Sequence, residues 1–123
     1  REINSVENLN EFVVEIVNKS FITDVSPLFV VACENPHHKY IQKSIGYSAA
    51  LAGADVVLLN CAAASAHSQF ESLFADGIFT LLSTPRGIFI EAELHTGEKE
   101  TVFMDCRYKK TGIIYNNYIQ GLK

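Results

Sequence analysis

The chain has 123 residues, of which 48% are hydrophobic and 20% are charged, and this composition predicts one folded domain rather than a disordered chain. The formal net charge is −4, and Lys109 and Lys110 are the only adjacent pair among the scattered basic residues. Without a basic stripe to follow a phosphate backbone, nucleic acid is excluded as a partner. No apolar stretch approaches the roughly 18 residues that a membrane-spanning helix needs, so a membrane partner is excluded as well.

The three cysteines, Cys33, Cys61 and Cys106, lie in or at the ends of apolar runs. An odd number at unrelated spacings does not form a disulfide framework, so we expect reduced thiols and a cytoplasmic protein. Because the chain begins with Arg1 rather than Met, we expect the single domain at residues 1–123 to be part of a longer protein.

The first predicted element is an amphipathic helix over residues 5–19, with apolar residues spaced by three and four along one face. Ser5 is its expected N-cap, and Glu7 lies in the first turn, where the helix dipole favours an acidic residue. Residues 21–27 mix Thr, Asp, Ser and Pro and indicate a connecting segment.

Two short apolar runs, residues 28–33 and 55–61, are typical of strands that are buried on both faces of a parallel sheet. Between them we predict a helix from His37 to about Ala52. Asn35 is its expected cap, Pro36 fits its first position, and Gly53 ends it. Such a crossover makes the two strands parallel neighbours.

A further helix is predicted from the small-residue loop at residues 62–65 to about Ala75, with Ser65 or Ser68 as its N-cap and Asp76-Gly77 as its end. Its expected inward side chains are Phe70, Leu73 and Phe74.

The pattern then changes to strands at residues 78–82, 88–95 and 101–107, separated by turn-rich segments, and residues 113–119 form a last strand or a short helix. The predicted fold class is therefore α/β or α+β: a mixed sheet with two central parallel strands, helices packed on it, and a C-terminal antiparallel meander.

Polar residues follow both apolar runs. Because the carboxyl ends of parallel neighbours meet at one edge of the sheet, we predict a binding site there for a small molecule or an anion. The interpretation that we favour is a non-catalytic ligand-binding or regulatory domain. Its predicted ligand-binding residues are Cys33, Asn35, His37, His38, Asn60, Cys61, Ser65 and His67.

One alternative is a small cysteine-dependent hydrolase or transferase, in which Cys33 or Cys61 is activated by a nearby histidine. No metal site is predicted, because the Cys-x3-His and Cys-x5-His spacings are not those of standard zinc modules. The glycine-rich phosphate-binding motifs are absent, so no cofactor is identified.

A second alternative is a structural interaction module. The C-terminal strands carry more aromatic residues than one face of a short meander needs, and aromatic residues are enriched at interfaces. We therefore predict that a homo-oligomer forms through some of these residues, which are Phe79, Phe89, Phe103, Tyr115 and Tyr118.

Overall fold

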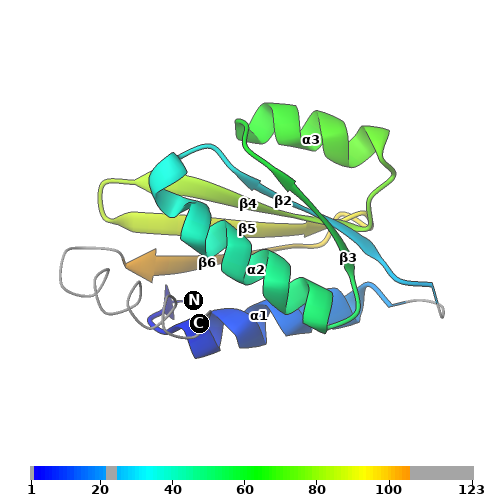
Figure 1. Ribbon diagram of the computed structural model, residues 1–123, viewed down its shortest axis with the longest axis horizontal. Coiled ribbons are helices and arrows are strands. Elements are labelled where there is room, and N and C mark those ends of the chain that lie inside the picture. The colour runs from blue at the N-terminus through cyan, green and yellow to red at the C-terminus, as the bar shows by residue number, and fades with distance from the viewer. Residues whose placement is uncertain (1, 22–24, 106–123) are drawn as a thin grey trace.

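The computed structural model describes residues 2–21 and 25–105, and it has the mixed α/β fold that the sequence predicts. The six-stranded sheet has the order β1-β6-β5-β4-β2-β3 (Figure 1). β2 pairs in parallel with β3 on one side and with β4 on the other, whereas β4, β5 and β6 form the antiparallel meander. The strands are β1 (Glu2–Ile3), β2 (Leu28–Cys33), β3 (Asp55–Leu59), β4 (Gly77–Thr84), β5 (Gly87–Leu94) and β6 (Lys99–Asp105).

Helices cover both faces of this sheet. Helices α1 (Val6–Lys19) and α2 (Lys39–Leu51) share the larger core with Phe29 and Val31 of β2, while α3 (Ala63–Ser72) packs on the opposite face. Figure 1 shows α3 standing apart from α1 and α2. Because consecutive side chains of a strand point to opposite faces, β2 contributes to both cores and its residues from Phe29 to Cys33 are all buried.

The prediction that the second apolar run is buried on both faces is wrong. β3 is the edge strand of the sheet, it ends at Leu59 rather than at Cys61, and its Leu58 side chain is 45% exposed. An apolar run shows that a strand packs against something. It does not show whether a further strand lies beyond it, and among the described residues none pairs with the outer side of β3.

Three predicted helix boundaries are confirmed. The Ser5 hydroxyl accepts a hydrogen bond from the backbone N–H of Asn8 at 3.1 Å and caps α1. The Asn35 side chain caps a short 3-10 turn, η1 (Pro36–His38), which leads directly into α2. Gly53 follows α2 with a φ of 104°, a conformation that favours glycine at a helix end.

The boundaries of α3 differ from the prediction. The helix begins at Ala63, so Ser65 and Ser68 lie inside it rather than at its N-cap, and it ends at Ser72 rather than near Ala75. Phe74 adopts a φ of 52°, and this left-handed turn leaves its side chain 91% exposed. Leu73 is also exposed, so of the three predicted inward residues only Phe70 is buried.

Two pairings were not predicted: the parallel contact of β2 with β4, and the parallel contact of β1 with β6. Asp76 fixes the first pairing where β4 begins. Its carboxylate accepts a hydrogen bond from the Leu28 N–H at 2.7 Å, and its own N–H donates to the Leu28 carbonyl. The predicted element at residues 113–119, which includes Tyr115 and Tyr118, lies outside the described residues, and so does Cys106.

The start of β4 depends on a residue without a side chain. A Cβ atom on Gly77 would lie 2.7 Å from Cζ of Phe29 and 2.9 Å from its Cδ2, and that ring is fully buried. We expect Gly77→Ala to destabilise the fold by about 1–3 kcal/mol, the usual cost of overpacking a core. The measurement is denaturant unfolding monitored by circular dichroism.

Gly46→Ala is the matched control. Its Cβ would lie 3.5 Å from Cγ1 of Val56 and 3.0 Å from Cδ2 of Leu58. The second contact is close, but it is with the end of a half-exposed side chain, which can shift by a few tenths of an ångström. Alanine also has a helix propensity better than that of glycine by about 1 kcal/mol. G46A should therefore be neutral or stabilising. Equal losses of stability in the two variants would contradict this account of Gly77.

Candidate functional site

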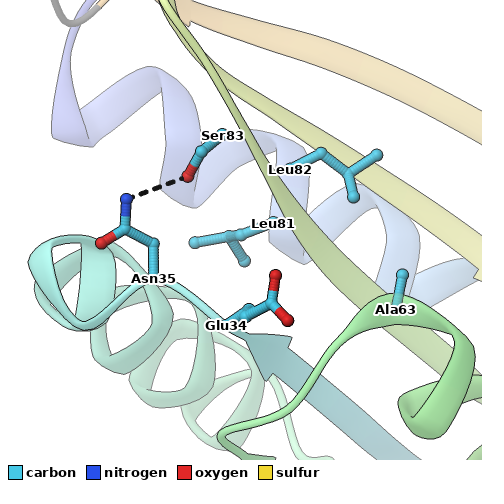
Figure 2. Close-up of a pocket in the computed structure, with 6 residues that line it drawn as sticks. All are labelled: Glu34, Asn35, Ala63, Leu81, Leu82 and Ser83. Atoms are coloured by element: carbon cyan, nitrogen blue, oxygen red, sulfur yellow. Dashed lines mark hydrogen bonds between the residues drawn. The ribbon is translucent and has the colours of Figure 1, made fainter.

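A crevice of about 320 Å³ opens at the carboxyl end of β2. It lies between the end of β4 and the first residue of α3, so three separate segments of the chain form it (Figure 2). Its lining residues are Glu34, Asn35, Ala63, Leu81, Leu82 and Ser83. This position, outside the carboxyl ends of parallel strands, is where open α/β sheets usually bind ligands.

Figure 2 shows the carboxylate of Glu34 directed into the space between β4 and Ala63. Leu81 is buried beside it, while Leu82 is 41% exposed. On the other side, the Asn35 side-chain amide donates a hydrogen bond to Oγ of Ser83 at 3.2 Å. The crevice therefore combines an apolar wall from β4 with one carboxylate and two neutral polar groups.

The Asn35 side chain joins η1 to β4. Its Oδ1 accepts a hydrogen bond from the His37 N–H at 2.9 Å, and its amide reaches Ser83. Oγ of Ser83 also lies 2.9 Å from Nδ1 of His38. Partial burial lowers the pKa of His38, and the neighbouring charge of His37 lowers it further. A neutral imidazole nitrogen can accept a hydrogen bond from the Ser83 hydroxyl group. The hydrogen bonds of Asn35, Ser83 and His38 therefore tie η1 to the end of β4.

Cys33 lies behind this network on the α1–α2 side of the sheet, where its thiol donates a hydrogen bond to the carbonyl oxygen of Asn35 at 3.2 Å. Burial raises the pKa of the Cys33 thiol, although the hydrogen bond to Asn35 and the charge of Lys39 act in the opposite direction. A raised pKa disfavours the thiolate that a nucleophilic cysteine needs.

The predicted residues that follow the second run lie elsewhere. Cys61 packs against the small core beneath α3, so it is on the opposite side of the sheet from Cys33. Asn60 and Ser65 are exposed. Nε2 of His67 lies 3.8 Å from a carboxylate oxygen of Glu93 on β5. The structure thus brings together Cys33, Asn35 and His38, with the His37 backbone, but it does not bring the two cysteines to one place.

A buried amide keeps the carboxyl ends of β2 and β3 adjacent. Nε2 of Gln42, on α2, donates hydrogen bonds to the carbonyl oxygens of Val31 at 2.9 Å and Leu59 at 3.0 Å. Gln42 is almost fully buried, and these two carbonyl groups satisfy both hydrogens of its amide nitrogen.

Sequence reasoning missed the contribution of β4 to the crevice. The sequence predicts a turn at Ser83 and a strand at Leu81 and Leu82. Each of these is a sound local interpretation, and no local pattern could have placed them beside Asn35. Only the parallel pairing of β2 with β4, in which Cys33 is opposite Leu81, brings them there.

A second hollow, of about 550 Å³, lies on the sheet face that carries α3 but toward the β6 side. Phe89 and Phe103 are cross-strand partners within it, with ring centroids 4.9 Å apart, and Phe89 is 41% exposed. Phe79, by contrast, is fully buried in the main core. The prediction that some of these aromatic residues form an oligomer interface stays a prediction.

No helix in the described ranges has the length and apolar character needed to cross a membrane. Comparisons with protein-family models, with curated proteins and with solved structures found no match.

The positions of the thiols make a testable distinction between the two described cysteines. Cys33 is 2% exposed and its pKa is raised by burial, whereas Cys61 is partly exposed. We expect iodoacetamide at neutral pH to label Cys61 first, and Cys33 only when denaturant unfolds the chain. Peptide mass spectrometry identifies the labelled residue. Labelling of Cys33 in the folded protein as fast as that of Cys61 would contradict the burial argument and would favour a cysteine-dependent enzyme.

Proposed function

We propose that the chain is a non-catalytic domain that binds a small polar molecule in the crevice at the carboxyl end of β2. The observation that carries the proposal is the Glu34 carboxylate directed into a crevice of about 320 Å³, beside the apolar wall of β4. This volume is at the lower end of the range of about 300–1,000 Å³ that is typical of small-molecule sites. The ligand is therefore small.

The charge of the crevice indicates the chemistry of the ligand. Ionised Glu34 accepts hydrogen bonds and attracts a positive group, so a simple anion is disfavoured. Ala63, at the opposite wall, is the first residue of α3, and Ala62 supplies no side-chain cap there. The first N–H groups of a helix have no partner within the helix and, with the helix dipole, favour a ligand oxygen.

A molecule that carries an ammonium or amide donor close to a carboxylate or carbonyl acceptor would satisfy both walls. Free amino acids and their amides are the simplest members of this class. Asn35 and Ser83 are already bonded to each other, so they shape one side of the crevice more than they offer free hydrogen-bonding groups.

A non-catalytic role fits the groups that are present. Burial raises the pKa of the Cys33 thiol and so favours its protonated form. The thiol lies behind the crevice wall, where it donates a hydrogen bond to the Asn35 carbonyl. The Ser83 hydroxyl is near His38, but its oxygen also accepts the Asn35 amide proton, an arrangement that fixes the position of η1.

The test is a thermal-shift screen of the twenty amino acids, their amides and simple primary amines, followed by calorimetric titration of the compounds that raise the melting temperature. Glu34→Gln should weaken binding by about 10- to 100-fold, because a hydrogen bond to a charged group contributes about 1.5–3 kcal/mol. Glu71→Gln is the matched control, since Glu71 is an exposed glutamate near the other end of α3. The proposal fails when no compound in the panel binds, or when E34Q and E71Q bind as tightly as the wild type.

A further inference from the structure

Three potential metal ligands meet on the sheet face that carries α3. His67 comes from α3, and Glu91 and Glu93 come from β5. One ligand atom from each residue lies within 4.8 Å of the other two, and all three residues are partly buried. This cluster is separate from the crevice, because none of its members lines it.

The fold explains why these residues converge. Along β5, Ile88, Ile90 and Ala92 face the main core, so Glu91 and Glu93 share the opposite face. On that face α3 is held by Ala66 and Phe70, which pack against the small core. His67 lies between Ala66 and Phe70 in the sequence, and its imidazole extends from α3 toward Glu93 on β5.

Two carboxylates on one face of a strand repel each other unless a cation lies between them. The Lys99 ammonium is 3.7 Å from Glu93, but its side chain is 59% exposed, so this ion pair is weak. His67 lies 3.8 Å from the same carboxylate, beyond hydrogen-bond distance. Neither of these contacts with Glu93 is short enough to be a hydrogen bond.

A buried hydroxyl beside the cluster is an independent observation. Thr80 is 3% exposed, and its Oγ1 has no hydrogen-bond partner among the described residues. Thr80 is the cross-strand partner of Glu91, so both side chains stand on the same sheet face, next to each other. Buried hydroxyl groups are normally hydrogen-bonded. A water molecule bound to a metal ion at the cluster would be a natural partner for it.

We propose that His67, Glu91 and Glu93 bind one divalent transition-metal ion, with zinc as the reference ion. An imidazole together with two carboxylates favours zinc and its neighbours over magnesium or calcium, which prefer oxygen ligands alone. Three protein ligands leave at least one position for water, and the Thr80 hydroxyl accepts or donates a hydrogen bond there. The proposal is independent of the ligand proposed for the crevice.

The test uses the whole chain after treatment with a chelator, titrated with Zn²⁺ in a calorimeter and with Co²⁺ in an absorption spectrometer. We expect one ion per chain and a Co²⁺ spectrum with visible d–d bands but without thiolate charge-transfer absorption. His67→Gln and the double variant E91Q/E93Q should each weaken Zn²⁺ binding by more than about tenfold, a loss that even second-shell changes produce.

His95→Gln is the matched control, because His95 is an exposed histidine that lies just beyond β5 and outside the cluster. Circular dichroism of each variant without metal confirms that it is folded. H95Q should bind Zn²⁺ as the wild type does. Absence of binding to the wild type, binding that survives in both H67Q and E91Q/E93Q, or a thiolate band in the Co²⁺ spectrum would overturn the proposal.

Discussion

Burial of β2 on both faces is the constraint on which the rest of the structure depends. Five consecutive residues, from Phe29 to Cys33, are almost completely removed from water, alternately into the core under α1 and α2 and into the core under α3. A strand in this position needs neighbours on both sides and helices on both faces. β3 and β4 supply the neighbours, and the connections through α2 and α3 supply much of the cover. Since these two connections run in opposite directions across the sheet and share one handedness, their helices lie on opposite faces.

The same constraint positions the polar groups. The chain leaves β2 toward η1 and α2 on one face, and it enters α3 on the other, so the two segments diverge at the carboxyl end of β2. Glu34 lies in this gap, with β4 along one side and the start of α3 along the other. Gln42 keeps β3 in place by bonding to carbonyl groups of both β2 and β3. Further along the same α3, His67 is carried over β5, where it meets Glu91 and Glu93.

Local sequence patterns predict the features that depend only on residues close together in the chain. The two apolar runs, the Ser5 and Asn35 caps and the end of α2 at Gly53 follow from periodicity and backbone preferences, and the structure has them. What depends on the order of strands could not be predicted. The edge position of β3, the pairing of β4 with β2, and hence the place of Ser83 in the crevice are set by contacts between distant segments. The alternation in β5 indicates that Glu91 and Glu93 share a face, but nothing in it shows that a histidine lies above them. The predicted end of α3 near Ala75 is wrong, because Phe74 rather than a glycine adopts the left-handed conformation after the helix.

The burial of β2 on both faces can be tested most directly by native-state hydrogen exchange, followed by NMR across a series of low denaturant concentrations. The structure predicts that the amides of Val30 to Cys33 exchange only through global unfolding, with the full free energy of unfolding. Outward-facing amides of the edge strand β3 should exchange through smaller, local openings. Exchange of the β2 amides as fast as that of the β3 edge amides would contradict the claim that the fold is built around this strand.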